Sequence, residues 1–376
     1  MRVFLVQGAQ VQEQPVWPDA VPETGFLWVA LERDEFEADL GPIQQALHRL
    51  GGAGLLDLHV SDLLNPSLPS TFESTDHYDL LVFRRLAQAE AAPSPAPQPT
   101  RGRGKASRGG MPVLRRLDTR PVGFVRFERL LLTVHPAACT SLDAYASRLL
   151  GLAGVPSHES REPGRSGPVR AMPASPADLM LRLIGQMVDA YLDLRRELTR
   201  QLDHWQTELL SPRTRFSNWS SLLDARLALH QLDEIGEDQR VALLDWQTAL
   251  ADWPAPGTST GRRERELLRV RTRDVLEHIE RVVHHVRRLE HSAETAVQIH
   301  FSAQSHRTND IMRTLTVLTA IFLPLNLIAG IFGMNFEFIP LLHAQLGFWL
   351  TLLAMGVTAA GLSAYFWRKR YLERGR

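Results

Sequence analysis

The chain has 376 residues, a length that suits one large domain or two ordinary ones. Basic and acidic side chains are equal in number, 42 of each, so global charge argues neither for nor against nucleic acid as a partner. A single cysteine, Cys139, excludes an intramolecular disulfide framework and a cysteine-based zinc finger. Residues 1–10 lack a basic region followed by a long apolar core, so we predict no signal peptide.

The first part of the chain, residues 1–172, alternates β-rich runs with helical patterns. Residues 26–31, 78–86 and 121–135 are rich in β-branched and aromatic side chains, and a helical pattern at 36–52 closes on glycines. This alternation predicts an α/β domain. We find no phosphate-binding glycine loop, zinc-protease motif or nucleophile elbow, so we expect no enzyme; a membrane-tethered enzyme or scaffold is a distant alternative.

Two segments of this part have the composition of disordered chain. Residues 87–112 are rich in Pro, Ala, Gly and Arg, and residues 152–174 are similar. An RGG-like segment can bind RNA, but an insertion between two strands is more often a solvated loop. We therefore predict a disordered insertion at about 87–112 and no nucleic-acid partner.

Long helical patterns occupy residues 173–310, which we predict to be a cytoplasmic stalk region. Three runs are expected, at 177–210, at 217–253, and from near Arg262 onward without a proline until Pro324. The third run has a heptad stripe that needs partner helices to bury it. Its members are Leu268, Thr272, Val275, Ile279, Val282, Val286, Leu289, Ala293 and Ala296.

Two uncharged runs near the C-terminus, Thr314 to Phe336 and Ala344 to Trp367, are each long enough to cross a bilayer as a helix. We predict membrane helices at 311–333 and 347–367, joined by a loop at 334–346 that contains no Lys or Arg. Arginines precede the first span, and a basic tail at 368–376 follows the second. The positive-inside rule therefore predicts a multi-pass protein of a bacterial-type inner membrane, with both termini cytoplasmic and the loop outside.

One face of the first span carries polar residues and glycines spaced by threes and fours. It consists of Asn309, Met312, Thr316, Thr319, Leu323, Asn326, Gly330 and Gly333. Two helices enclose no space, so a conducting chain must form a ring of copies. Polar groups at membrane depth are costly unless they face water or a bundle interior, so we predict that this stripe lines a pore. The alternative is that these residues only join helices together.

The segment "NDIMRTLTVLTAIFLPLNLIAGIFGMNFEF", followed by a second span and "RKRYL", resembles the CorA magnesium transporter family. The family signature is Gly-Met-Asn at the outer end of the first of two C-terminal spans. The resemblance is strong over about residues 300–376. It implies an α+β membrane protein with an N-terminal α/β cytoplasmic domain, a long helical stalk and two C-terminal transmembrane helices. It further implies a funnel-shaped homopentamer in the lipid bilayer that transports divalent cations, with no organic cofactor.

The resemblance also implies roles for single residues. Gly333, Met334 and Asn335 would form the selectivity filter, with Asn335 holding Mg²⁺ through its water shell, and Glu337 would lie at the mouth. Mg²⁺ keeps its water tightly, so amide and carbonyl oxygens that bond to the hydrated ion suit it. Asn309 would form a polar ring at the inner end. Met312 and Leu323 would form apolar constrictions that gate by excluding water.

Three positions depart from the family pattern. Leu341 stands where an acid is usual, and Asn326 stands where threonine is common. The family regulates itself by binding Mg²⁺ between paired carboxylates of cytoplasmic domains. Asp62 matches one of these carboxylates, but its partner falls on Gln298, a neutral amide that binds Mg²⁺ more weakly. Mg²⁺ is therefore expected as the transported ion, and Asp62 as one half of a weakened regulatory site.

Zinc transport is the main alternative. The related ZntB zinc transporters share the fold and carry Gly-x-Asn at the mouth. Imidazole suits Zn²⁺, and the stalk carries His278, His284, His285, His291, His300 and His306. We favour the interpretation that these histidines are solvated residues of the stalk. Met334 and the residues after it favour Mg²⁺, with Co²⁺ or Ni²⁺ as further ions, over a ZntB-like, proton-coupled zinc transporter.

Overall fold

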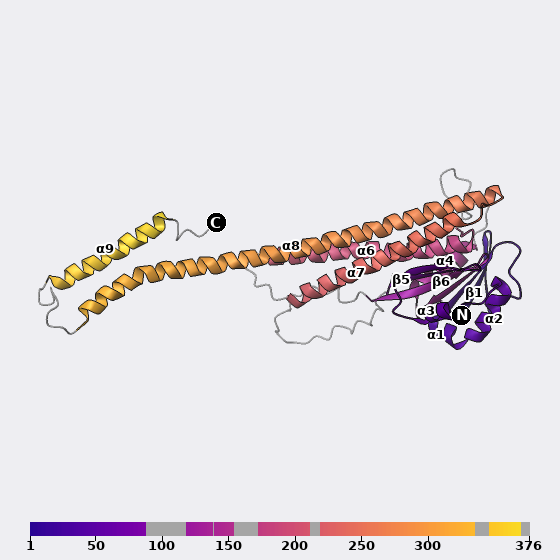
Figure 1. Cartoon of the computed structure of the whole chain (residues 1–376), viewed down its shortest axis with the longest axis horizontal. Coiled ribbons are helices and arrows are strands. Elements are labelled where there is room, and N and C mark those ends of the chain that lie inside the picture. The colour runs from indigo at the N-terminus through magenta and orange to yellow at the C-terminus, as the bar shows by residue number, and fades with distance from the viewer. Residues whose placement is uncertain (88–117, 138, 154–171, 211–218, 335–345, 370–376) are drawn as a thin grey trace. The chain divides into compact units, whose positions relative to one another are not determined.

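The computed structural model describes residues 1–87, 118–137, 139–153, 172–210, 219–334 and 346–369. The chain divides into two compact units, Met1–Ala293 and Glu294–Arg376 (Figure 1). The predicted insertion at 87–112 and the predicted loop at 334–346 lie almost wholly outside the described residues, so their predictions stay untested.

A seven-stranded sheet forms the centre of the first unit. Its strands are β1 (Arg2–Gln7), β2 (Gln10–Gln14), β3 (Phe26–Glu32), β4 (Thr71–Ser74), β5 (Asp79–Leu86), β6 (Thr119–Arg126) and β7 (Leu130–His135). Their order in the sheet is β2-β1-β3-β7-β6-β5-β4. Strands β3 and β7 pair in parallel, and the other neighbouring strands pair antiparallel.

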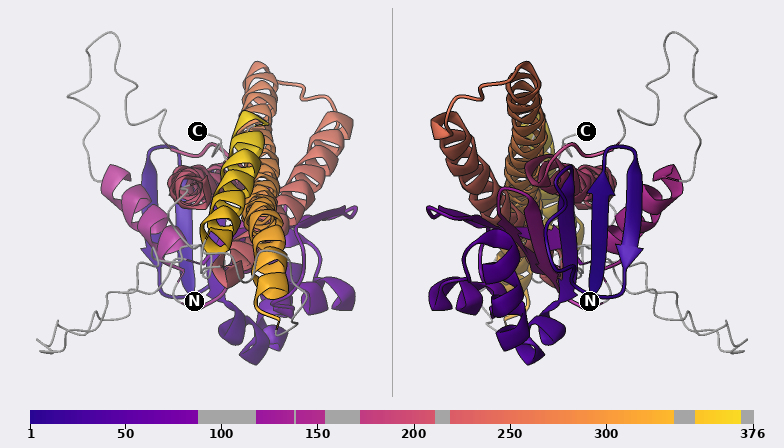
Figure 2. Two further views of the ribbon diagram at one scale, coloured as in Figure 1. Left: turned by 90° about the vertical axis from the view of Figure 1, so that its left-hand side faces the viewer. Right: turned by 90° about the vertical axis from the view of Figure 1, so that its right-hand side faces the viewer.

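Helices cover both faces of this sheet (Figure 2). The helices of the first unit are α1 (Arg33–Ala38), α2 (Leu40–Gly51), α3 (Asp57–Leu64), α4 (Thr140–Ala153), α6 (Pro176–Leu210), α7 (Trp219–Asp252) and the beginning of α8 (Ser259–Phe332). Side chains alternate along β5, so that Leu80 and Val82 pack with α1–α3 while Leu81 and Phe83 pack with α4 and the long helices. The predicted α/β domain is therefore a three-layer unit with a mixed sheet.

The long helices pack against one another as the heptad stripe predicts. All nine stripe residues of α8 are buried, from Leu268 to Ala296. Helix α6 runs parallel to α8, since Asp178 contacts Arg271 and Thr199 contacts His285. Helix α7 returns antiparallel and approaches closely at Gly236, where an added Cβ would lie 2.6 Å from the Cγ2 of Val283.

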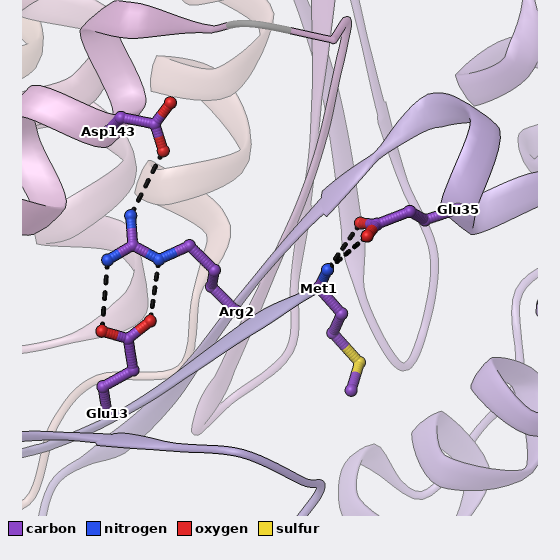
Figure 3. Close-up of polar contacts among 5 residues, drawn as sticks. All are labelled: Met1, Arg2, Glu13, Glu35 and Asp143. Carbon is purple, nitrogen blue, oxygen red and sulfur yellow. Dashed lines mark hydrogen bonds and ion pairs between the residues drawn. The ribbon is translucent and has the colours of Figure 1, made fainter.

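Charged side chains join the first strands to the neighbouring helices (Figure 3). The Arg2 guanidinium bonds to Glu13 on β2 at 2.8 Å and to Asp143 on α4 at 3.2 Å. The amino group of Met1 bonds to Glu35 on α1 at 2.6 Å. Exposed ion pairs of this kind contribute at most about 1 kcal/mol each. The two hydrophobic cores, one on each face of the sheet, therefore remain the main source of stability.

Three expectations about local structure need correction. Residues 121–135 do not form one run, because residues 127–129 turn the chain into the antiparallel pair β6–β7. The helical pattern at 36–52 is divided at Asp39 between α1 and α2. Strands β1 and β2, at the edge of the sheet, lie in residues for which we predict no strand from the sequence.

Candidate functional site

Among the described residues, two helices have the length and composition of membrane spans: α8, through its C-terminal part, and α9 (Gly347–Arg368). The most apolar stretch of each helix is only 6% buried in the single chain. The core helix of a soluble protein would be mostly buried, and a signal sequence would lie near the N-terminus. The exposed apolar surface therefore requires lipid or another copy of the chain to cover it.

One face of α8 is partly covered in the single chain, since only Val317 on it is buried and its other residues are half-buried. Buried or half-buried residues repeat there at helical spacing: Arg313, Val317, Ala320, Ile321, Pro324, Leu325, Ile328 and Phe332. Val317 is the most enclosed of them, with 2% of its surface exposed.

The predicted pore-lining stripe lies on the opposite side of the same helix. All eight of its residues are exposed, from Asn309 through to Gly333. With about 3.6 residues per turn, the centre of this stripe lies roughly 150° around the helix from the covered face. The stripe is thus free to face other copies or an aqueous path.

The threonines of the stripe have a defined hydrogen-bond geometry. Thr316 donates its hydroxyl proton to the carbonyl of Met312, and Thr319 donates to Leu315, each at 2.8 Å. Because the proton is used inside the helix, each exposed hydroxyl oxygen presents lone pairs outward. The water molecules around a cation point their hydrogens outward, so a row of neutral acceptors matches a hydrated cation.

Helix α8 ends at the predicted filter. The Gly333 amide donates to the Ala329 carbonyl at 2.9 Å, and the Met334 amide donates to Ile331 at 3.3 Å, so the last turn tightens. The φ of Gly333 lies outside the left-handed region, but a Cβ there would lie 3.0 Å from the Ala329 oxygen. Asn335 and Glu337 lie outside the described residues, and their roles stay predictions.

His285 is buried among the stalk helices and both of its ring nitrogens have protein partners. Arg288 donates to Nδ1 at 2.8 Å, and Nε2 lies 2.8 Å from the hydroxyl of Thr199, which itself donates to the Arg195 carbonyl. The ring is therefore neutral, with its proton on Nε2. Burial and the charges of Arg195 and Arg288 lower the pKa of His285.

The predicted metal-binding residues of the stalk and the first unit are not gathered into one cluster. In the described parts of the chain, no three His, Cys, Asp or Glu side chains lie close enough to hold a metal ion. Asp62 is half-buried in the last turn of α3, and Gln298 is exposed on α8. Whether these two residues meet between copies stays a prediction.

Sequence reasoning missed two polar residues that extend the stripe. Ser305 lies four positions before Asn309, and Thr308 lies four positions before Met312; both are exposed. The same spacing by threes and fours would have found them, but the prediction began the stripe at Asn309. These residues continue the polar face beyond the predicted membrane depth.

Comparisons with known proteins agree with this arrangement. The model of the family described as "CorA-like Mg2+ transporter protein" matches residues 111–370. The "Cobalt/magnesium transport protein CorA" of Thermotoga maritima is 37% identical over 100 residues, which cover 27% of this chain and 28% of that protein. The "Magnesium transport protein CorA" of Escherichia coli is 28% identical over 149 residues, which cover 40% and 46%.

Solved structures show the same fold along nearly the whole chain. The complete structure of the CorA magnesium transporter from Methanocaldococcus jannaschii matches with a TM-score of 0.68 and 16% identity, over 98% of both chains. The full-length CmaX protein matches with a TM-score of 0.58 and 20% identity, over 98% of this chain and 97% of that one. Because the family model covers more than half of the sequence, the chain belongs to the CorA-like Mg²⁺ transporter family.

Proposed function

We propose that this protein is a divalent-cation channel that carries hydrated Mg²⁺, with Co²⁺ or Ni²⁺ as further ions, across a bacterial-type inner membrane. Five copies surround one pore, both termini of each copy are cytoplasmic, and the C-terminal part of α8 lines the pore. Helix α9 forms the outer wall toward lipid. The first unit, in the cytoplasm, controls opening.

The exposed polar stripe of α8 is the observation that carries this proposal. A polar face on a membrane-crossing helix is costly in lipid, so it needs water or protein beside it. The stripe lies on the side of α8 opposite to its partly covered face. A ring of copies places every stripe at the axis and hides it from lipid.

The stripe favours a hydrated ion over a dehydrated one. Thr316 and Thr319 offer neutral acceptor oxygens, which bond to the ion's water without replacing it. Asn326 adds an amide between Thr319 and the predicted filter at Gly333. Met312 and Leu323 are exposed on the same face and supply the narrow apolar rings that close a pore by excluding water.

Residues at the outer end of the pore select the ion, and residues at the inner end and in the cytoplasmic unit control opening. Gly333, Met334 and Asn335 select the ion at the outer end, and Glu337 raises the local cation concentration at the mouth. Asn309 forms the inner polar ring. Because Gln298 replaces a carboxylate opposite Asp62, cytoplasmic Mg²⁺ inhibits this channel more weakly than it would with two carboxylates.

Asn335→Ala tests the filter. The variant, in liposomes with a Mg²⁺-sensitive dye inside, is expected to lose most of the Mg²⁺ influx because the pore entrance loses a ring of amide oxygens. Native mass spectrometry is expected to give the same five-copy mass as the unmodified protein. Thr358→Ala on α9 is the control, and it should keep normal flux. Normal flux through Asn335→Ala would refute the assigned filter.

A further inference from the structure

A buried carboxylate between two arginines marks a second site, in the first unit. Asp178 on α6 is fully buried. Its Oδ2 lies 3.2 Å from the Nε of Arg182, and its Oδ1 lies 2.8 Å from the Nε of Arg271 on α8. Two positive charges thus share one negative charge in a place that is largely shielded from water.

The bonding in this triad is incomplete. Asp178 Oδ1 and Arg271 Nε are buried and close, but they are not aligned as a hydrogen bond. The two terminal nitrogens of Arg271 have no hydrogen-bond partner within the described ranges. Burial lowers the pKa of Arg271, and the nearby charge of Arg182 acts in the same direction. A second negatively charged group would therefore be stabilised beside Arg182 and Arg271.

A cavity of about 350 Å³ opens directly beside these guanidinium groups. Helices α4, α6 and α8 line it, and Arg148 on α4 supplies a third guanidinium. Tyr145 is buried at the same cavity, where burial raises the pKa of its hydroxyl. Apolar side chains, among them Leu149 and Val275, form another part of the wall. The volume is in the range of small-molecule sites, about 300–1,000 Å³.

Two acids also line the cavity, and they lie on its solvent side. The side chains of Asp189 and Asp274 are 66% and 69% exposed, and each lies within 4 Å of the His278 ring, at 3.8 and 3.9 Å. Water and salt screen charges that are exposed to this degree. The shielded end of the cavity, with Arg182, Arg271 and the buried Asp178, therefore carries one excess positive charge, while Arg148, Asp189 and Asp274 are exposed.

We propose that this cavity binds a small organic anion, whose phosphate or carboxylate group bonds to Arg271 and Arg148. Guanidinium groups bind both kinds of anion through paired hydrogen bonds. The apolar wall calls for a ligand with a ring or hydrocarbon body, because a bare ion would leave most of the volume unfilled. The binding of this ligand does not depend on the proposed transport.

Isothermal titration calorimetry on the full-length protein in detergent tests this site with three probes: inorganic phosphate, adenosine monophosphate and citrate. Saturable binding of adenosine monophosphate or of citrate is expected, and which of them binds identifies the anionic group. Arg148→Gln is expected to weaken the binding at least tenfold, and since Arg148 is exposed, the variant keeps its fold. Arg271→Gln is expected to weaken it by more.

Arg269→Gln is the matched control, because Arg269 is an exposed arginine on the same helix that does not line the cavity. It should bind like the unmodified protein. Failure of all three probes to bind would overturn the proposal. Binding that survives both Arg148→Gln and Arg271→Gln, or that Arg269→Gln weakens equally, would overturn it as well.

Discussion

Thr316 and Thr319 illustrate how a single hydrogen bond decides what a side chain offers to its surroundings. Each hydroxyl proton goes back to the carbonyl four residues earlier, which leaves an acceptor on the exposed face. The sequence predicted the face from spacing alone. It could not predict where each hydroxyl proton is donated. That depends on a formed helix, which brings the carbonyl four residues earlier within reach, and on the absence of a nearer acceptor.

Replacing both stripe threonines tests this acceptor role. The double variant Thr316→Val, Thr319→Val keeps the shape of both side chains and removes the oxygens. We expect Mg²⁺ flux in liposomes to fall about fivefold, which corresponds to roughly 1 kcal/mol in the barrier. Thr314→Val is the matched control, since Thr314 makes the same bond to its helix but lies near the covered face. Equal losses in the two variants would contradict the stripe.

His135 gives the first unit a pH-dependent stability. The ring lies at the end of β7, is 7% exposed and donates from Nδ1 to the Pro136 carbonyl at 3.0 Å. Burial is the largest cause of its lowered pKa. Between that lowered value and 6.5 the unfolded chain binds more protons than the folded one, so the free energy of unfolding falls as the pH drops below 6.5.

Urea denaturation of the full-length protein at pH 7, 6 and 5, followed by tryptophan fluorescence, measures this dependence. We expect the free energy of unfolding to decrease across the series, and to decrease less in His135→Asn, which keeps a donor near Nδ1. His285, whose pKa is also lowered, contributes in the same direction. The lowered pKa values of Glu13 and Glu35 act below pH 4.5, outside this window. If the free energy of unfolding depends on pH equally in His135→Asn and in the unmodified protein, the assignment of this dependence to His135 is wrong.

The long helices were the most predictable elements of the molecule. Their apolar residues repeat for many turns, so the period alone fixed the buried face of α8, and all nine heptad positions are buried. The expected starts and ends agree with α6, α7 and α9 to within a few residues. The stalk histidines show the limit of this reasoning, because periodicity placed His285 near a face but could not reveal its bonds to Thr199 and Arg288.

Ile279→Ala tests the packing that this period predicts. Ile279 is 1% exposed, so removing three of its carbons should lower the free energy of unfolding by about 2–4 kcal/mol. Val270, on the same helix, is 60% exposed, and Val270→Ala should change it by less than about 0.5 kcal/mol. Urea denaturation of both variants gives the comparison. Similar values would show that the stripe is not a packed core.

Short elements of the first unit were harder to predict. The turn between β6 and β7 contains no Gly, Pro, Asn or Asp, so it lacks the usual turn residues, and the edge strand β2 has mainly polar residues and gives no strong periodic signal. The cavity beside Asp178 was not predicted at all. It depends on residues from α4, α6 and α8 that lie up to 130 positions apart in the sequence, and only the fold brings them together.

At the scale of the whole molecule, the proposed function depends on copies that a single chain does not contain. The predicted pore stripe is exposed in the single chain, and exposed apolar residues surround it, so lipid or other copies must cover this surface. Membership of the CorA-like family supports the ring of copies and the ion, but the aligned parts of the Thermotoga and Escherichia proteins cover less than half of their lengths. The substrate is therefore the central claim to be tested.

The most direct test is a parallel measurement of Mg²⁺ and Zn²⁺ flux into liposomes that contain the purified protein. The membrane potential and the pH gradient are imposed separately. We expect Mg²⁺ influx that an inside-negative potential increases, since each charge gains about 2.3 kcal/mol per 100 mV, and that a pH gradient leaves unchanged. Zn²⁺ influx that requires the proton gradient, without Mg²⁺ influx, would contradict the proposed magnesium channel.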